Sequence, residues 1–178
     1  MIARPATEAD LDEVMSMVDD FVRDHPARDH PRDRAAFGAA LFGARAVGEL
    51  VVAERDRAVV GMLHWAPLFD LFWGLRGGIA DWLYVRPASR GLGVPALLVA
   101  KVCARIREEG GEFLSGTAST ETKPVYARAA IPVDEATWSV HLSAEAFQVV
   151  ADLDGRPARQ IVRGLPDPAL NRTPRRPR

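Results

Sequence analysis

The sequence predicts a single α/β domain, and three observations support this fold class. The 178 residues fall within the usual size of one domain, and 48% apolar residues can supply a normal core. Short alternating segments typical of strands and longer segments with helical spacing follow one another along the chain. Between Ile79 and Leu98, a strand, a glycine turn and an amphipathic helix come without a spare residue between them.

The first part of the chain predicts a strand, two helices and a hairpin. Thr7 is expected to cap the first helix, and the proline-containing segment 23–31 predicts a loop. The expected elements are a strand at 2–4, helices at 8–23 and 34–45, and strands at 49–54 and 58–65. A long connection is expected at 66–78. It contains five large apolar residues, which should be covered by other parts of the protein: Leu68, Phe69, Leu71, Phe72 and Trp73.

The second part of the chain predicts alternating strands and helices and then a tail. The expected elements are a strand at 81–85, a helix that begins at Val94, a strand at 113–117, a helix at 123–130, a strand at 137–142 and a last helix at 144–152, capped by Ser143. Gly155 and Pro157 are expected to end compact structure. This divides the chain into a domain at 1–153 and a C-terminal extension at 154–178 with a tail rich in proline and arginine.

The strand, turn and helix around residue 90 predict an anion site. Pro87 ends the strand, residues 90–93 read Arg-Gly-Leu-Gly, and a helix follows. Peptide N–H groups at the start of a helix point out of its end, and the helix dipole adds partial positive charge there. A phosphate or pyrophosphate suits such a position.

The run LYVRPASRGLG resembles motif A of the GNAT acetyltransferase superfamily, in which a strand ending in LYV precedes R/Q-x-x-G-x-G/A and a helix. Pro95 replaces the last Gly or Ala of that pattern and brings no N–H group. The opening IARPATEADLDEV resembles the start of many members. The run PVYARAAI stands where members carry FYERLGF, although Ser119 and Ala130 depart from the pattern. The resemblance covers about residues 1–153.

The resemblance implies a central mixed, twisted, mostly antiparallel sheet flanked by helices. It also implies direct transfer of an acetyl group from acetyl-CoA to a primary amine, without a metal. Backbone groups of Leu83, Tyr84 and Val85 are then expected to pair with the pantetheine amides of the coenzyme. Peptide N–H groups at the turn and the helix start are expected to face its pyrophosphate, at Arg90, Gly91, Leu92, Gly93, Val94 and Ala96.

Two catalytic residues are expected. A primary amine has a pKa near 10.4, so attack on a thioester needs a group that removes a proton. Asp81 stands where related enzymes carry a glutamate, begins the expected strand, and is turned by alternation away from Trp82. Tyr126 matches the tyrosine that donates a proton to the leaving sulfur. His64 is an alternative proton relay, because histidine can exchange a proton near neutral pH.

The acceptor is expected to be a small molecule with a primary amine, with polyamine-type members as the nearest comparison. Acids in the first loop and Asp70 in the aromatic connection would suit an organic cation through charge pairing and cation–π contact. A protein or peptide amine stays open as the acceptor, and so does a homodimer. A non-catalytic acyl-CoA-binding domain is the alternative function, because Pro95, Ser119 and Ala130 depart from the family pattern.

Composition limits the other functional classes. A net charge of −1 gives no reason to expect nucleic acid or an anionic membrane as a partner, although an arginine-rich tail at 172–178 leaves an interaction module as a third reading. Cys103 is the single cysteine, so a cytoplasmic setting and a buried packing role are expected. No run of 18 apolar residues predicts a membrane span, and the N-terminus does not resemble a signal peptide.

Overall fold

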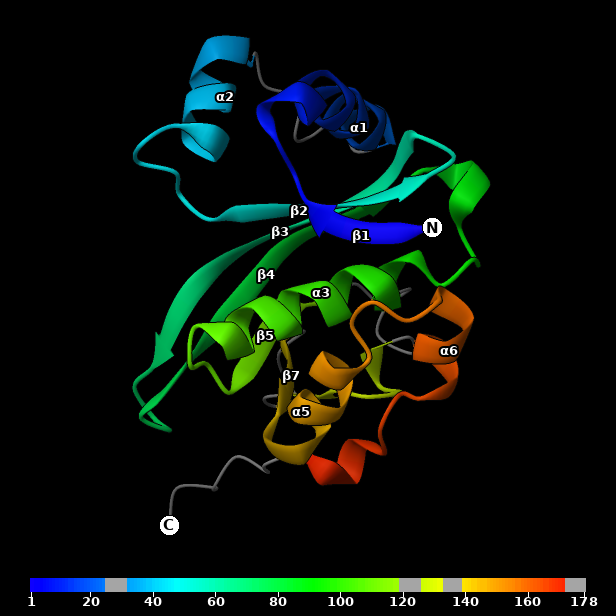
Figure 1. Cartoon of the computed structure of the whole chain (residues 1–178). Helices are drawn as coiled ribbons and strands as arrows, with labels where there is room; N and C mark the ends of the chain where they lie inside the picture. Colours follow the sequence, from blue (N-terminus) through cyan, green and yellow to red (C-terminus); the bar gives the residue numbers. More distant parts are fainter. Residues whose placement is uncertain (25–31, 119–125, 133–138, 172–178) are drawn as a thin grey trace.

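The computed structural model describes residues 1–24, 32–118, 126–132 and 139–171. Its centre is one seven-stranded sheet with the strand order β1-β2-β3-β4-β5-β7-β6 (Figure 1). β4 and β5 pair in parallel, and the other neighbours pair antiparallel. The strands are β1 (Ile2–Pro5), β2 (Glu49–Arg55), β3 (Ala58–Asp70), β4 (Leu75–Val85), β5 (Phe113–Thr117), β6 (Ile131–Pro132) and β7 (Ser139–Ser143). The predicted mixed, mostly antiparallel sheet is confirmed.

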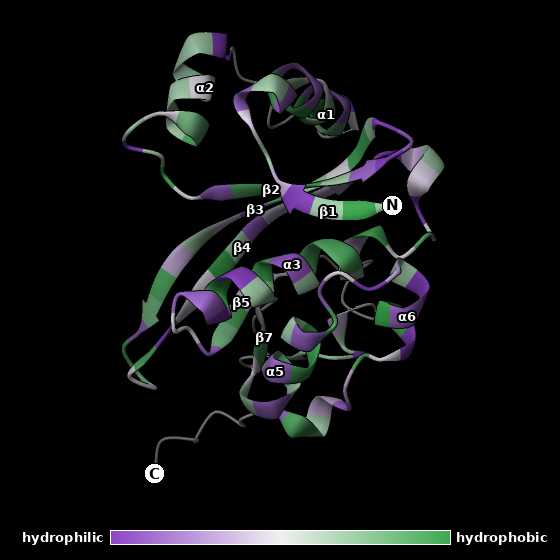
Figure 2. Cartoon of the chain, in the orientation of Figure 1, coloured by the Kyte–Doolittle hydropathy of each residue, from purple (hydrophilic) through white to green (hydrophobic). Residues whose placement is uncertain are grey.

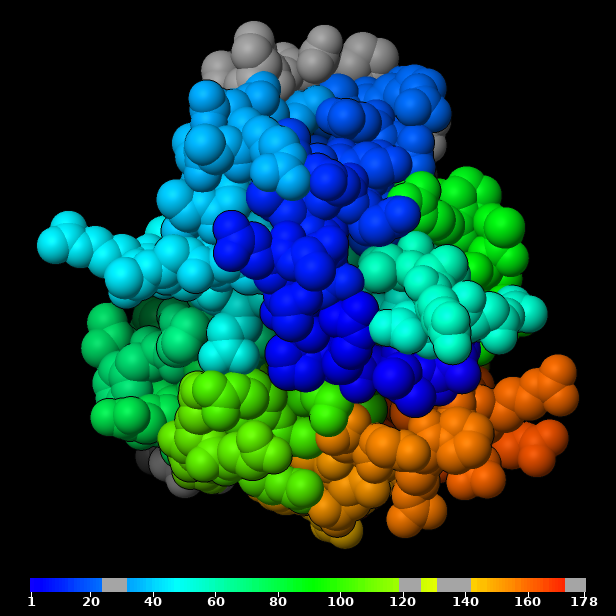
Figure 3. Space-filling model, turned by 45° about the horizontal axis from the view of Figure 1, so that its top comes forward, coloured from blue at the N-terminus to red at the C-terminus, as the bar shows by residue number. Residues whose placement is uncertain are grey.

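Helices cover both faces of the sheet (Figure 1). One face carries α1 (Leu11–Asp24), which follows the 3-10 turn η1 (Glu8–Asp10), and α2 (Arg34–Phe42). The other face carries α3 (Val94–Glu108), α5 (Ala144–Asp152) and α6 (Ala158–Arg163). Two further 3-10 turns are η3 (Pro87–Ser89) and η4 (Pro168–Leu170). In Figure 3, the N-terminal residues, in dark blue, lie between the light-blue residues of α2 and the green residues of α3.

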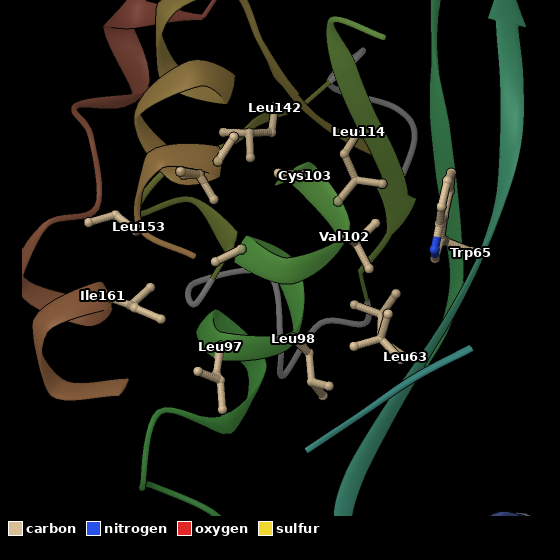
Figure 4. Close-up of a cluster of buried hydrophobic side chains, with 14 of the residues drawn as sticks. Leu63, Trp65, Leu97, Leu98, Val102, Cys103, Leu114, Leu142, Leu153 and Ile161 are labelled. Atoms are coloured by element: carbon tan, nitrogen blue, oxygen red, sulfur yellow. The ribbon is translucent and has the colours of Figure 1, made fainter. Parts of the chain in front are cut away.

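The core has two parts because successive strand side chains point to opposite faces. In β2, Val51 and Ala53 pack on the α3 side, while Leu50 and Val52 pack on the α1 side. Figure 4 shows the larger α3-side cluster, in which Trp65 of β3 lies across from residues of α3 such as Val102. The single cysteine, Cys103, is fully buried in this cluster, as expected, and burial raises the pKa of its thiol.

Ion pairs fix the first helix to the sheet. Arg4 of β1 places two guanidinium nitrogens 2.8 Å from the two carboxylate oxygens of Asp10, and its Nε donates to Glu54 of β2. Asp10 also accepts a hydrogen bond from the backbone N–H of Thr7. This arrangement explains why the opening segment carries an arginine and an aspartate six residues apart. It joins β1 to the start of the helical segment.

The expected connection at 66–78 is wrong: these residues form the outer arms of a hairpin. β3 continues to Asp70, β4 begins at Leu75, and the register runs from Ala66↔Ile79 to Asp70↔Leu75. Pro67 and three glycines of this segment are residue types that disfavour strands, but cross-strand pairing overrides that local preference. The carboxylate of Asp70 closes the turn by accepting hydrogen bonds from two backbone N–H groups, 2.8 and 2.9 Å away. Asp70 therefore has a structural role.

The apolar residues of this hairpin are only partly covered. Trp73 packs edge-on against Phe113, with ring centroids 6.3 Å apart. Leu71 and Phe72 at the turn are 85% and 99% exposed, and Phe69 is also exposed. Figure 2 shows hydrophobic residues at this turn. The expectation that the whole segment is covered is therefore wrong within the described part of the chain.

We expected compact structure to end near Gly155 and Pro157, and this expectation is wrong. Ile161 of α6 is fully buried in the α3-side core. Asn171, also buried, accepts a hydrogen bond from the backbone N–H of Ser143 at 2.7 Å and donates to the carbonyl of Ala129 at 2.8 Å. Residues 158–171 therefore pack on the same core as the rest of the domain.

Several sequence-based expectations fall outside the described residues. They concern the loop at 25–31, the first three residues of the expected helix at 123–130, Ser119, and the tail at 172–178. The described residues 126–130 of that expected helix form mainly a turn. Within the described ranges, no helix has the length and apolar character needed to cross a membrane. In the same ranges, no three His, Cys, Asp or Glu side chains are grouped closely enough to hold a metal ion.

Candidate active site

A wedge opens in the sheet where β4 and β5 separate. Their parallel pairing covers only Gly78↔Leu114 to Ala80↔Gly116. Beyond it, among the residues that the structure describes, the next part of β4 pairs only with β3. A cavity of about 120 Å³, here called the wedge pocket, lies at this separation and is mainly apolar. Its wall includes β4 residues 81–83, Thr117 of β5, Tyr126, and Pro95 and Ala96 of α3.

The predicted strand, turn and helix unit is present at the entrance to α3. Gly91 and Gly93 have φ angles of 76° and 80°, a left-handed region that glycine adopts without strain. α3 begins at Val94, and Pro95 lies in its first turn. The backbone N–H of Arg90 donates to the carbonyl of Pro87, and its Nε donates to the carbonyl of Val85. Arg90 therefore holds the turn in shape, and its own N–H is not among the donors that the turn presents outward.

The other expected coenzyme residues lie along one path from β4 to α3. Leu83 lines the wedge pocket and Ala96 faces it from α3. Tyr84 and Val85 are buried, with Tyr84 on the α1 side and Val85 on the α3 side. Leu92 is partly exposed at the turn. Of the expected coenzyme residues, Leu83 and Ala96 therefore line the wedge pocket, whereas Tyr84, Val85 and residues 90–94 are not among its lining residues.

Asp81 is the extra residue of a β-bulge in the middle of β4. We expected it to begin a strand, but β4 begins six residues earlier, at Leu75. His64 pairs with Trp82 and Trp65 pairs with Ala80, so Asp81 has no partner of its own. The bulge breaks the alternation on which the expected side-chain direction depended. As a result, the Asp81 carboxylate reaches the histidine of the neighbouring strand.

The imidazole of His64 and the carboxylate of Asp81 form a close pair. His64 Nδ1 lies 2.6 Å from Asp81 Oδ1. The His64 side chain is 22% exposed and the Asp81 side chain is 59% exposed, so the carboxylate is the more accessible group. Gly48 lies on the other side of the imidazole: a Cβ atom added there would be 2.7 Å from His64 Nε2. The histidine ring is therefore confined between Gly48 and Asp81.

Tyr126 lies on the wall of the wedge pocket that also includes Asp81, so the structure brings the two expected catalytic residues to one cavity. Its carbonyl accepts hydrogen bonds from the N–H groups of Ala129 and Ala130, which fix the turn that follows it. Burial raises the pKa of the Tyr126 phenol, because the phenolate would be poorly solvated there. The hydroxyl therefore keeps its proton at neutral pH and can donate it.

A second cavity, here called the acceptor cleft, lies between the sheet and the helices α1 and α2. It has a volume of about 520 Å³. His64, Asp81 and Trp82 form the part of its wall that belongs to the centre of the sheet. Asp70 and the hairpin residues 66–78 do not line it, so they do not form the cation site that we expected there. Asp81 lines both the acceptor cleft and the wedge pocket.

Sequence reasoning missed the pairing of His64 with Asp81 and the role of Gly48. The two members of the pair are 17 residues apart and meet through strand register, which one sequence does not display. A signal was available in part: His64 and Asp81 fall on two successive strands, and both are polar residues next to tryptophan. Cross-strand proximity of these positions follows once a tight hairpin is assumed.

The fold defines an α+β protein whose sheet splays open beside a helix with a glycine-rich N-terminal turn. Its class is that of the coenzyme A-dependent acyltransferases. A model of the acetyltransferase (GNAT) family matches residues 14–131, and the chain belongs to this family. No curated protein matches the chain in sequence.

Solved structures show the same fold at low sequence identity. A ribosomal-protein-alanine N-acetyltransferase from Brucella melitensis biovar Abortus is 21% identical, with a TM-score of 0.63 over 78% of this chain and 97% of that one. An aminoglycoside acetyltransferase from an uncultured soil metagenomic sample is 15% identical, with a TM-score of 0.57 over 69% and 80%. An acetyltransferase from Corynebacterium glutamicum is 20% identical, with a TM-score of 0.56 over 80% and 96%.

Proposed function

We propose that this protein transfers an acetyl group from acetyl-CoA directly to the primary amine of a small molecule. The single observation that carries the proposal is the position of Asp81, which lines the wedge pocket and the acceptor cleft together. An amine that enters from one side and a thioester that enters from the other would meet at this carboxylate. A proton acceptor at that meeting point is what the reaction needs.

The residues divide the proton transfers between them. Asp81 takes a proton from the ammonium group, so that the free amine can attack the thioester carbonyl carbon. His64 acts as a positioning residue, because its Nδ1 at 2.6 Å holds the carboxylate. As the new C–N bond forms and the C–S bond breaks, the second proton of the nitrogen restores the phenol of Tyr126, and Asp81 releases the first proton to solvent. Tyr126 supplies a proton to the departing sulfur from its neutral phenol.

The residues around the wedge fit the coenzyme. The edge of β4 beyond Ala80 offers backbone groups for the amides of the pantetheine arm. Gly91 and Gly93 shape the turn at the start of α3, where N–H groups would hold the pyrophosphate. Bound there, acetyl-CoA supplies the activated acetyl group. Pro95 removes one N–H group, which lowers the number of donors but keeps the helix start.

The test is an acetyl-transfer assay on the purified protein with acetyl-CoA and a panel of primary amines, followed by release of free thiol and by mass of the product. Calorimetric titration with coenzyme A is run in parallel. The proposal expects coenzyme binding and an amine-dependent thiol release that Asp81→Asn lowers about 100-fold. Coenzyme binding with no transfer to any amine would instead support an acyl-CoA-binding domain. Transfer only to peptide amines would overturn the small-molecule assignment.

A further inference from the structure

The walls of the acceptor cleft are mainly apolar. They combine one face of α1 with residues of α2 and of the sheet: Val14, Val18, Phe21, Phe37, Leu41 and Met62. Phe21 also packs edge-on against Trp82, with ring centroids 5.0 Å apart. A volume of about 520 Å³ is in the range that holds a small organic ligand. The lining provides apolar contact over most of this volume.

Charged groups in the cleft are few. Of the described residues that line it, Asp81 is the one carboxylate and Arg32 is the one guanidinium. Arg32 is held by Asp19 at 2.6 Å. A second ammonium group of an acceptor would therefore lose its hydration against apolar walls, with no second carboxylate among the described lining residues to pair with it. Burying a charge without a partner is costly.

The carboxylates on the outer side of α1 do not offer a second site for an ammonium group, because they are already paired. Asp12 is paired with Arg34 at 2.7 Å. Glu13 and Asp20 are both paired with Arg86, at 2.6 and 3.1 Å. Asp19 is paired with Arg32, so four carboxylates of α1 already have arginine partners in the same chain. A polycation would have to displace those partners.

From this lining we infer that the acceptor is a monoamine with a mainly apolar body of ring size, of the arylalkylamine type, and not a polyamine or an aminoglycoside. The inference rests on the proposed function. The amine nitrogen lies at Asp81, and the apolar body extends between α1 and α2. A phenyl or larger ring replaces water along Phe21, Phe37 and Leu41, which favours binding through the hydrophobic effect.

The experiment measures both binding and turnover for 2-phenylethylamine, hexylamine and spermidine. Calorimetric titration gives each affinity in the presence of coenzyme A, and the thiol assay gives kcat/KM. We expect 2-phenylethylamine to exceed spermidine about tenfold or more in both measurements, a difference of the size that apolar pockets produce. Spermidine binding as tightly as 2-phenylethylamine would overturn the inference.

A matched pair of variants locates the effect in the cleft. Leu41→Asp places a carboxylate on the cleft wall, whereas Ala40→Asp places one at the neighbouring exposed position of α2. We expect Leu41→Asp to weaken 2-phenylethylamine binding about tenfold and to narrow its advantage over spermidine, while Ala40→Asp changes neither. Thermal unfolding verifies that both variants fold. Phe37→Leu is a milder variant, expected to lower the same affinity severalfold.

The outcomes separate the two proposals. If 2-phenylethylamine binds preferentially but is not acetylated, the proposed transferase reaction fails and the assignment of the cleft stands. If spermidine is bound and acetylated in preference, the transferase reaction stands and the assignment fails. Absence of binding by all three amines overturns the assignment. Equal effects of Leu41→Asp and Ala40→Asp also overturn it.

Discussion

Gly93 lies directly against Ala158, so the turn before α3 is packed onto α6. A Cβ atom added at Gly93 would be 3.1 Å from the Cβ of Ala158 and 3.2 Å from Cγ2 of Val162. Gly91, two residues earlier, has nothing within 4 Å of the same added atom. The two glycines of the turn share a left-handed backbone, but only the second meets another helix. The C-terminal segment thus supports the turn at residues 90–93.

Gly93→Val is expected to weaken coenzyme A binding about tenfold and to lower the melting temperature. The valine adds the cost of a left-handed backbone to a clash with α6, which moves the turn. Gly91→Val is the control: it places the same side chain on a similar left-handed backbone without the clash. Calorimetric titration and thermal unfolding of both variants check this. An equal loss in the two would show that the contact with α6 does not matter.

Removing the carboxylate of Asp81 is expected to lower kcat/KM about 100-fold, the usual scale for a general base. Asp81→Asn keeps the size of the side chain and removes the proton acceptor.

His64→Ala is expected to lower kcat about tenfold with little change in KM for coenzyme, because it frees the carboxylate from its partner. His64→Asn keeps a donor near the Nδ1 position and should recover part of that loss. Steady-state rates for all three variants give the test, and a His64→Asn rate equal to that of His64→Ala would remove the positioning role.

The local structure around the turn at residues 90–93 could be predicted from sequence because each signal is local. Pro87 ends a strand, glycine marks the positive φ positions, and Pro95 suits the first turn of a helix. Apolar residues at helical spacing then identify α3. These features depend on neighbours in the chain, so no tertiary contact needs to be known.

The parts that sequence reasoning missed depend on pairing between distant residues. The bulge at Asp81 exists because β3 and β4 pair with a register shift at His64 and Trp65. The outer hairpin contains Pro67, a residue typical of loops, and forms through cross-strand pairing. Gly155 and Pro157 predict an end of compact structure, but Ile161 of the helix after them is buried through contacts that no local pattern displays.

Tyr126→Phe is expected to slow acetyl transfer about 10 to 100-fold and to leave coenzyme affinity nearly unchanged. The substitution removes only the hydroxyl that donates a proton to the sulfur. Burial raises the pKa of the phenol, so the wild-type hydroxyl stays protonated from pH 6 to 9 and the ratio of the two rates should be constant over that range. Thiol release at several pH values and coenzyme titration check this. Equal rates in the two proteins would remove Tyr126 from the mechanism.

Acid should weaken the ion pair between Arg4 of β1 and Asp10 of η1. The hydrogen bonds from Arg4 lower the pKa of Asp10 from 3.8 to about 2. The carboxylate therefore stabilises the fold fully above about pH 4, and this contribution is lost as the pH falls toward 2. It amounts to about 2 kcal/mol. Denaturant unfolding between pH 2 and 5 should show this slope in the wild type and a smaller one in Asp10→Asn; identical slopes would contradict the assignment.

Gly48→Ala is expected to lower kcat by displacing the imidazole of His64. The added methyl group would lie 2.7 Å from His64 Nε2 and 2.6 Å from the carbonyl oxygen of Trp65, so it must push the imidazole or the strand away. Loss of the fixed imidazole should lower kcat to about the level of His64→Ala. A double-mutant cycle separates this from general destabilisation, because in the His64→Ala background the same substitution should lower the melting temperature but not kcat further. An additional drop in kcat in that background would show that Gly48 matters for a reason other than confinement of the histidine.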